Sequence, residues 1–532
     1  MSENPAPPYE SYVERILDAL RRSPEHTALI TAEGRAVPAG ELHEAVLLSA
    51  AALAEHGVRR GSTVSLLVGD RPEALVARYA ANLLGARVVS LGLGSAPGTQ
   101  AAIVDSVGTA ALLVDPDLRT AGEALLALVR VPAVLTLDSA PTDWHPAAVA
   151  GSALRPGRTG TATGTTAGPK GAAQAEDDWC IRFTGGTTGI PKGIRMAHGP
   201  YGRLLVSHAA RLAPSPPPRF LACTALAHMA GIVADATLLA GGTVVLRSGF
   251  DPLDVITALE RERITDLWLL PPLLYELLDH PALATADLSA LRRVFYGGTP
   301  ASAERLHRAA ELLGPVLYGW YGQTEAGNIT EVLPHEHGVT GPDGRITVGR
   351  AQEGVEIEIR DPRGAVLPTG RNGEIHVRTP MLMSGYWRRP DLTAQVLRDG
   401  WISTGDVGHL DGDGFLHLVD RLKEMVIVVG GHVYPAEVEQ VLLAHPAVAQ
   451  CAAFGTRRAD GSEELQAAVV PAAGHRLDRE LVRGFVTERL GSMYAPAAVH
   501  VLDRLPLTEA GKPDRKLLRA TLGPDHGQPD QG

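Results

Sequence analysis

The stretch DWCIRFTGGTTGIPKG, residues 178–193, joins an apolar strand pattern directly to a loop of glycine, threonine and lysine. Glycines let backbone amides close on an anion, threonine hydroxyls add donors, and a lysine adds positive charge. These are the ingredients of a triphosphate-binding loop, although the spacing is not that of the Walker A motif. The candidate phosphate-binding residues are Thr184, Gly185, Gly186, Thr187, Thr188, Gly189 and Lys192.

A second copy of nearly the same letters, GTTAGPKG at residues 164–171, lacks this context. It lies within residues 155–176, which are rich in Gly, Thr and Ala, have no periodicity and predict a surface loop. A solvated loop is also the alternative interpretation of the first copy. The strand that precedes residues 184–193 favours a binding role there.

Helix and strand patterns alternate on both sides of the loop at residues 184–193. Residues 10–150 alternate helix-like segments with short apolar runs, which indicates α/β layers around a largely parallel sheet. Residues 202–330 repeat this alternation, and residues 340–420 change to short period-two runs with tight turns. We therefore predict an α/β protein with a large N-terminal domain of layered α/β subdomains plus a small β-rich subdomain, residues 1–421. A small α+β C-terminal domain, residues 422–532, should follow it.

The composition of the chain argues against a membrane span and against nucleic acid as a binding partner. Of 532 residues, 45% are apolar and 20% charged, and we find no apolar run near the roughly 20 residues that a membrane helix needs. The net charge of −11 without a basic stripe disfavours nucleic acid as a partner. Cys180, Cys223 and Cys451 form no disulfide framework or metal spacing, and the N-terminus has no secretory pattern. We expect a cytoplasmic protein without a membrane span.

Three further blocks carry a resemblance to a known family. They are YGQTEAG at residues 321–327, WISTGDVGHLDGDGFLHLVDRLKE at 401–424 and LPLTEAGKPDRKLLR at 505–519. In order and spacing, these blocks and the 184–193 loop resemble the core motifs of the adenylate-forming superfamily. That superfamily includes acyl-CoA synthetases, nonribosomal-peptide adenylation domains and beetle luciferases. The resemblance implies an enzyme that uses ATP, Mg²⁺ and coenzyme A, with a mobile C-terminal domain.

The resemblance assigns roles around the triphosphate. The 184–193 loop matches the one that holds the β- and γ-phosphates, with Gly185 where the family usually has Ser. Glu325 matches the carboxylate that binds Mg²⁺, and Thr324 matches the residue that contacts the α-phosphate. Without the other blocks, a Thr-Glu pair would rather suggest the start of a helix.

The resemblance also implies a nucleoside site. Tyr321 matches the residue that stacks on adenine, and Gly298 and Thr299 line its other side. Asp406 matches the acid that binds the ribose diol, and Arg421 matches its ribose or phosphate partner. Each charge taken alone would more often be a solvated loop residue.

Three residues near the C-terminus match the catalytic lysine, the hinge and the thiol tunnel. Lys512 resembles the lysine that neutralises charge as the carboxylate attacks the α-phosphate, which suits a reaction driven by positioning and positive charge. Alone, it would more often be a surface lysine in a turn. Lys423 falls at the family's hinge. Gly430 matches a glycine beside the pantetheine, although Val429 stands where many relatives have a second glycine.

The acyl pocket is the least specified part of the site. His228 resembles the residue bordering the acyl carboxylate, although a lone His among apolar residues is more often packed. Asp235 is the only acid near it in AHMAGIVADATLL, and it lies away from any motif match, which disfavours an α-amino acid substrate. The small residues of this segment would leave volume for an acyl group, although small residues on a buried helix usually serve close packing. The candidate acyl-pocket residues are His228, Gly231, Gly298, Trp320 and Gly322, of which Gly322 replaces the Trp of acetate-specific relatives.

The leading hypothesis is an acyl-CoA or aryl-CoA synthetase acting on a small-molecule carboxylic acid. The alternatives are a stand-alone ligase that loads a carrier protein or stops at the adenylate, and a nucleotide-binding regulatory protein. The presence of Glu325, Asp406, Arg421 and Lys512 argues against the regulatory alternative.

Overall fold

The computed structural model describes residues 9–137, 171–184, 192–213, 216–341, 346–421, 426–428, 431–458, 462–472, 474–508 and 511–523. The chain forms two compact units. Unit 1 comprises residues 1–268, 286–292 and 381–394, and unit 2 comprises residues 269–285, 293–380 and 395–532. Most of the predicted surface loop at 155–176, including residues 155–170, lies outside the described residues.

Unit 1 contains the largely parallel sheet that the sequence predicts. Its strand order is β18-β8-β7-β4-β3-β5-β6, and the ladders joining β7, β4, β3, β5 and β6 are parallel. Buried Val, Leu and Ile fill these strands because both faces of a parallel sheet are covered. The strands are β3 (Thr63–Leu67), β4 (Arg87–Ser90), β5 (Ala111–Val114), β6 (Ala133–Thr136), β7 (Asp178–Thr184), β8 (Lys192–Ala197) and β18 (Gly385–Tyr386).

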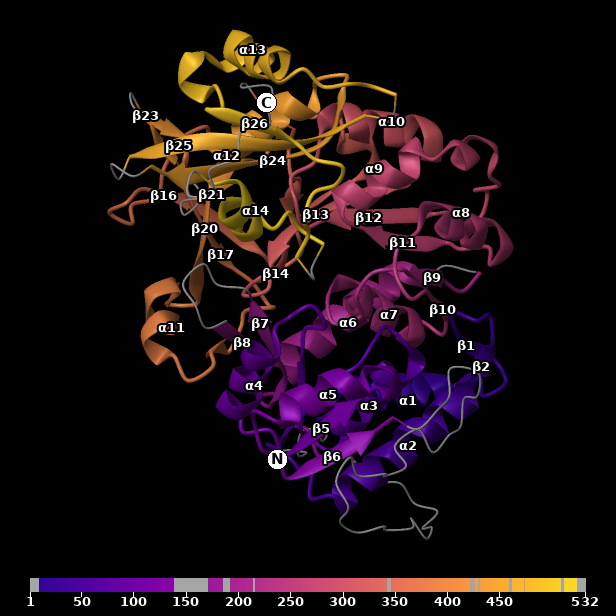
Figure 1. Cartoon of the computed structure of the whole chain (residues 1–532). Coiled ribbons are helices and arrows are strands. Elements are labelled where there is room, and N and C mark those ends of the chain that lie inside the picture. The colour runs from indigo at the N-terminus through magenta and orange to yellow at the C-terminus, as the bar shows by residue number, and fades with distance from the viewer. Residues whose placement is uncertain are drawn as a thin grey trace, which may run out of the picture. The chain divides into compact units, whose positions relative to one another are not determined.

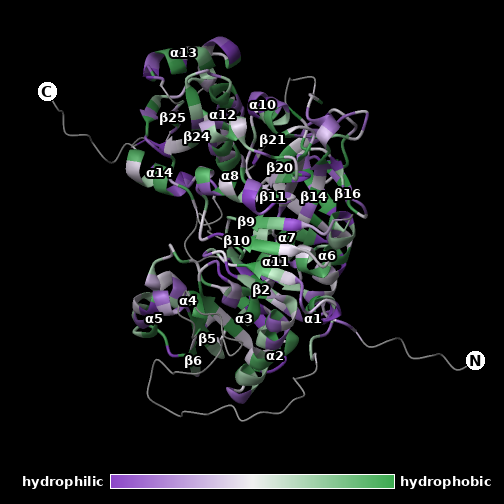
Figure 2. Cartoon of the chain, turned by 90° about the vertical axis from the view of Figure 1, so that its right-hand side faces the viewer, coloured by the Kyte–Doolittle hydropathy of each residue, from purple (hydrophilic) through white to green (hydrophobic). Residues whose placement is uncertain are grey.

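A second sheet of unit 1 contains the parallel neighbours β9, β10 and β1, with β2 antiparallel at its edge and β11 beside β9. The apolar strands β9 and β10 stand out in green in Figure 2. These strands are β1 (Thr27–Ile30), β2 (Ala36–Pro38), β9 (Arg219–Ala222), β10 (Thr243–Leu246) and β11 (Asp266–Leu269).

Helices surround the sheets of unit 1 (Figure 1). The first begins after a capping box in which Ser11 and Glu14 bond each other's backbone N–H groups. The helices are α1 (Tyr12–Arg22), α2 (Ala39–Glu55), α3 (Pro72–Leu83), α4 (Pro97–Ser106), α5 (Arg119–Leu126), α6 (His198–Leu212), α7 (Met229–Leu239) and α8 (Pro252–Arg261). A short helix, α11 (Pro390–Val396), follows β18 in sequence.

Unit 2 begins with α9 (Pro271–Asp279), which contacts β12 (Arg293–Gly297). The next helix, α10 (Ala303–Leu313), contacts α9. Next to β12 lie β13 (Leu317–Gln323), β14 (Gly327–Val332) and β15 (Arg350–Ala351). The predicted β-rich subdomain is confirmed as a separate antiparallel sheet of β16, β17, β20, β19 and β21. Its strands are β16 (Glu356–Arg360), β17 (Gly373–Arg378), β19 (Leu397–Arg398), β20 (Trp401–Leu410) and β21 (Leu416–Arg421).

The last part of unit 2 is the predicted α+β segment, in which β24 pairs antiparallel with β25 and β25 pairs parallel with β26. Its elements are β22 (Val426–Val428), β23 (Gly431–Val433), α12 (Pro435–Leu443), β24 (Val448–Arg457), β25 (Glu463–Pro471), α13 (Arg479–Leu490), β26 (Ala498–Val501) and α14 (Arg515–Leu522). The segment has its own core, which includes Val438, Val469 and Val486. The mixed α/β class is thus confirmed. The compact units do not divide after residue 421, and the domain boundary there stays a prediction.

Among the described residues, no helix is both long enough and apolar enough to cross a membrane.

Candidate active site

The predicted phosphate-binding loop joins two paired strands. Thr184 ends β7, Lys192 begins β8, and the two residues are partners in the antiparallel ladder. The Lys192 ammonium lies 5.5 Å from the ring centroid of Tyr386, a cation–π distance. Residues 185–191, with the predicted Gly185, Gly186, Thr187, Thr188 and Gly189, lie outside the described residues.

Unit 2 brings the predicted nucleoside residues Tyr321, Asp406 and Arg421 together. Asp406 on β20 is paired in register with Arg421 on β21, and the Arg421 Nε lies 2.9 Å from the Asp406 Oδ1. The Tyr321 hydroxyl donates a hydrogen bond of 2.7 Å to the other oxygen, Oδ2. The pKa of the Arg421 guanidinium is raised, first by the Asp406 charge. Burial, and then Asp406, raise the pKa of the Tyr321 hydroxyl, so this group stays a donor.

Asp406 is only 4% exposed and is held by its own strand. The backbone N–H of Asp406 donates to the Thr404 Oγ1 at 3.0 Å, and the Thr404 hydroxyl donates to the Ile375 carbonyl oxygen at 2.8 Å. Gly405 between them has a φ of +71°, which suits a residue without Cβ. Thr404 is a positioning residue that the sequence reasoning missed, although it stands in the quoted block around Asp406. Each carboxylate oxygen can accept a second hydrogen bond, so the ribose assignment fits Asp406.

The predicted catalytic lysine lies beside the predicted adenine site. A Cβ built on Gly298 would be 3.8 Å from the Lys512 Cε. The Lys512 side chain is exposed, yet surrounding protein desolvates its amine and lowers its pKa, and Arg421 lowers that pKa further. The Asp406 and Glu325 carboxylates act in the opposite direction. Lys512, Arg421, Asp406 and Glu325 therefore share one electrostatic environment.

Thr324 and Glu325 occupy the turn between β13 and β14, not the start of a helix. Both are half-buried. Gly298 follows β12 with a φ of +85°, and the neighbouring Thr299 has a buried Oγ1 without a hydrogen-bond partner in the described part of the chain. The orphaned hydroxyl stands where the resemblance places adenine. It provides an unused hydrogen-bonding group next to flat glycine backbone.

In unit 1, His228 is the N-cap residue of α7 and is half-buried. The turn before it is held by Asp70, whose Oδ1 accepts from the Leu226 N–H at 2.8 Å. A Cβ on Gly231 would lie 2.0 Å from the Leu226 carbonyl oxygen, so this position requires glycine for close backbone packing. Backbone packing alone thus explains why residue 231 is a glycine, and the role of Gly231 in an acyl pocket stays a prediction.

Trp320 and Gly322 on β13 have structural roles of their own. Trp320 is 7% exposed, stacks on Phe295 with ring centroids 4.3 Å apart and donates from Nε1 to Glu331 at 2.8 Å. A Cβ on Gly322 would lie 2.2 Å from the Gly327 carbonyl oxygen across the hairpin. Both residues therefore serve the packing of β13, and their acyl-pocket assignment stays a prediction.

Asp235, the only acid near His228 in its segment, is fully buried and occupied by protein donors. Its carboxylate pairs with Arg78 and accepts from the hydroxyls of Tyr79 at 2.5 Å and Tyr201 at 2.6 Å. A carboxylate committed to three internal donors is a poor partner for the ammonium of a substrate. The expectation that an α-amino acid is disfavoured stays a prediction, and the internal bonds of Asp235 are compatible with it.

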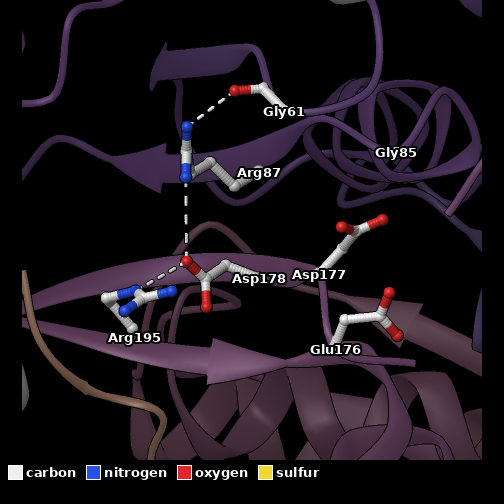
Figure 3. A pocket seen from close by; sticks show the side chains of 7 residues that line it. All are labelled: Gly61, Gly85, Arg87, Glu176, Asp177, Asp178 and Arg195. Carbon is white, nitrogen blue, oxygen red and sulfur yellow. Dashed lines mark hydrogen bonds and ion pairs between the residues drawn. The ribbon is translucent and has the colours of Figure 1, made fainter. Parts of the chain in front are cut away.

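A polar pocket of about 120 Å³ in unit 1 lies at the beginning of β3, β4 and β7 (Figure 3). Arg87 donates to the Gly61 carbonyl oxygen at 2.6 Å, and Arg195 donates to Asp178 Oδ2 at 2.8 Å. Asp178 and Thr184 are at opposite ends of β7, about 20 Å apart at the usual rise of a strand. The pocket contains none of the predicted site residues. It is lined by Gly61, Gly85, Arg87, Glu176, Asp177, Asp178 and Arg195.

Lys423 and Gly430, the predicted hinge and tunnel residues, lie outside the described residues. In the described ranges, no group of three or more His, Cys, Asp or Glu side chains is arranged to hold a metal ion. Mg²⁺ in phosphate-transfer sites needs only one or two carboxylates, because phosphate oxygens and waters complete its shell. Glu325, the ligand that the resemblance predicts, would therefore suffice as the only carboxylate at such a site.

Comparison with known proteins identifies the family. The model of the AMP-binding enzyme family matches residues 17–387, and that of the AMP-binding enzyme C-terminal domain matches residues 437–512. A feruloyl-CoA synthase from Amycolatopsis sp is 36% identical over 94% of this chain and 97% of its own. A medium/long-chain-fatty-acid–CoA ligase from Mycobacterium tuberculosis is 34% identical over 95% of this chain and 89% of its own.

A solved structure shows the same architecture. The amide bond synthetase McbA from Marinactinospora thermotolerans superposes with a TM-score of 0.83 at 37% identity, covering 96% of this chain and 99% of that chain. The chain therefore belongs to the AMP-binding enzyme family, as its resemblance to adenylate-forming enzymes predicts.

Proposed function

We propose that this enzyme activates a carboxylic acid with ATP and transfers the acyl group to coenzyme A. A carboxylate oxygen attacks the α-phosphorus, the bond from that phosphorus to the pyrophosphate oxygen breaks, and acyl-AMP and pyrophosphate form. The coenzyme A sulfur then attacks the acyl carbonyl carbon, the carbon–oxygen bond to AMP breaks, and the thiol proton is released. The full-length likeness to two CoA ligases supports this reaction.

The observation that carries the proposal is that Arg421 and Tyr321 are bonded to Asp406 in unit 2 and that Lys512 lies beside Gly298. The Asp406 and Glu325 charges act on the Lys512 amine there. Adenylyl transfer needs little covalent help from the protein and gains most from positioned charge. The ammonium of Lys512 would neutralise charge that develops on the α-phosphate. Asp406 and Arg421 would hold the ribose, and Thr324 would contact the α-phosphate.

Mg²⁺ fits the same cluster through Glu325. The ion would supply charge neutralisation on the phosphate oxygens, and the half-buried carboxylate of Glu325 would hold it. Tyr321 and Gly298 would enclose adenine, and the loop from Thr184 to Lys192 would hold the outer phosphates. We further assign Lys423 to the hinge and Gly430 to the pantetheine path, on the resemblance alone.

The substrate class is a carboxylic acid other than an α-amino acid, because Asp235 is already bound by protein donors. A fatty acid and an aromatic acid are the classes that the relatives' names suggest. The three buried, unbridged cysteines suit the reducing cytoplasm that we propose as the site of action.

An amine is a second candidate acceptor, because the amide bond synthetase matches over the whole length of this chain. In that case the amine nitrogen replaces the sulfur as the nucleophile, and the first step is unchanged. A carrier-protein thiol is the remaining acceptor to test. The named CoA ligases favour coenzyme A over both.

The test is release of AMP and pyrophosphate from a panel of fatty and aromatic acids, with coenzyme A, a pantetheine-bearing carrier protein, amines or no acceptor. We expect an acid that gives pyrophosphate, with AMP release that depends on coenzyme A. Lys512→Ala should abolish adenylation, whereas Lys516→Ala, a change to an exposed lysine on α14, should leave it intact. AMP release that responds only to amines would assign amide synthesis. No turnover of any acid would refute the proposed function.

A further inference from the structure

We infer that α9 is the dock that places Lys512 for adenylation, and that Leu270 and Glu276 on it are positioning residues. The inference rests on the proposed function, because it needs Lys512 to act in the first half-reaction.

The first contact joins Leu270, the N-cap residue of α9, to the turn that carries Lys512. A Cβ on Gly511 would lie 3.0 Å from the Leu270 Cδ1, and one on Gly298 would lie 3.8 Å from its Cδ2. Gly511 also has a φ of +72°, so glycine is needed there for both shape and space. The Leu270 side chain thus lies between Gly511, next to Lys512, and Gly298 of the predicted adenine site.

The turn that carries Lys512 is tightly bonded. The Thr508 N–H donates to the Lys512 carbonyl oxygen at 2.7 Å, and the Gly511 N–H donates to the Thr508 carbonyl oxygen at 2.8 Å. The Lys512 N–H donates to the Thr508 Oγ1 at 3.2 Å. A contact made at Gly511 therefore fixes the backbone of Lys512 as well.

The second contact lies further along α9, about 9 Å from the first at the rise of a helix. The Gln450 Nε2 of β24 donates to the Glu276 Oε1 at 3.1 Å. Gln450 is three residues from Ala453, whose carbonyl oxygen accepts from the Arg515 Nε at 2.9 Å. Arg515 also pairs with Glu439 at 2.5 Å.

These links make the two contacts one dock. Arg515 is three residues from Lys512 and ties the segment after the Lys512 turn to β24. The C-terminal segment therefore contacts α9 at two places, the Lys512 turn and β24, and Arg515 links these two places. Each contact prevents the segment from rotating about the other. A side chain that acts through Lys512 should matter only in the step that uses Lys512.

The test separates the two half-reactions. Adenylation is measured as acid-dependent exchange of pyrophosphate into ATP, and transfer is measured in single turnovers of preformed acyl-adenylate with coenzyme A. Leu270→Ala should slow exchange by roughly 10- to 100-fold, the usual effect of misplacing a reacting group by about 1 Å. Gln450→Ala should slow it by roughly two- to tenfold, the loss of one hydrogen bond. Transfer should stay within about twofold of the wild type in both.

Matched variants control for general damage. Leu283→Ala removes a similarly buried leucine, 5% exposed against 6% for Leu270, from the same segment of unit 2. Glu276→Ala should slow exchange as Gln450→Ala does, because both changes remove the same hydrogen bond. Glu304→Ala, which removes an exposed glutamate of α10, is its control. If Leu283→Ala matches Leu270→Ala in exchange, or if both half-reactions fall together, the dock is refuted.

A second readout needs no activity. The native cysteines are all buried, so Glu276→Cys with Gln450→Cys provides an isolated pair for a short bifunctional thiol reagent. We expect an intramolecular cross-link that neither single variant forms. Absence of that cross-link would overturn the dock, whereas a cross-link in a chain that activates no acid would refute the proposed function and leave the dock in place.

Discussion

In the proposed adenylation step, Lys512 must carry its positive charge, and its surroundings favour loss of the proton that gives this charge. Desolvation first, and Arg421 second, lower the pKa of its amine. A lysine with a lowered pKa releases its proton below about pH 10.4, the ordinary value. Since only the ammonium form neutralises the α-phosphate, adenylation should decline on the alkaline side below that pH.

Arg421→Gln should move this alkaline decline to higher pH. The change removes a positive charge that lowers the Lys512 pKa, so the proton should be held longer. The measurement is the pH dependence of kcat for adenylation at saturating ATP, because the variant also loses its ion pair with Asp406 and should raise the KM for ATP. An alkaline limb that is unchanged or moved to lower pH would contradict the assignment of Lys512.

The sequence named Tyr321, Asp406, Arg421 and Lys512 because each stands in a recognisable motif, and the structure places them together. Leu270 could not be named in this way. Its contact with Gly511 joins residues far apart in the chain, and its local pattern, LWLLPPLLYELL, indicates only a buried strand followed by a helix. Long-range packing of an apolar side chain leaves no local signature.

At the scale of elements, the hairpin of β13 and β14 contains a glycine that backbone packing requires but that the sequence alone suggests as part of a substrate pocket. The sequence interpretation had Gly322 opening a pocket, but a side chain there would collide with the Gly327 carbonyl oxygen. Gly322→Ala should therefore lower the free energy of unfolding by about 1–3 kcal/mol through overpacking. Gly338→Ala, where a Cβ meets nothing within 4 Å, is the matched control in denaturant unfolding. Equal stability of the two variants would return Gly322 to the pocket hypothesis.

Element types were predictable where periodicity and caps agree. The pattern YVERILDALRR predicts a helix, and α1 spans those residues, Tyr12–Arg22, behind its capping box. The turn at Thr324 and Glu325 was less predictable, because a Thr-Glu pair fits a helix N-terminus as well as a hairpin. The pairing of β13 with β14 decides between them, and pairing is a tertiary property.

At the scale of the whole molecule, Asp235 in unit 1 bears on both the stability of the fold and the proposed substrate class. It joins α7 to α3 through Arg78 and Tyr79, and to α6 through Tyr201. Asp235→Ala would leave the Arg78 guanidinium, in a residue 8% exposed, without its counter-charge. We expect a loss of about 3–5 kcal/mol in the free energy of unfolding.

Tyr79→Phe is the milder comparison, with an expected loss of about 1 kcal/mol, because it removes one hydrogen bond and leaves the ion pair. Thermal or denaturant unfolding of the purified variants measures both. A stable Asp235→Ala protein would contradict this buried network, and wild-type activity on α-amino acids that the variant loses would show that the carboxylate faces the substrate.

The pairing of Thr184 with Lys192 has a thermodynamic consequence for nucleotide affinity. Bringing the ends of a seven-residue connection together costs chain entropy of about 1.7 kcal/mol at 25 °C, apart from a constant term. The pairing of β7 with β8 offsets this entropy loss when the protein folds, because the two strands hold both ends of the connection together. In the proposed function, ATP binding at this connection would be relieved of that entropic penalty, and its affinity should depend on the two paired strands as well as on the groups that touch phosphate.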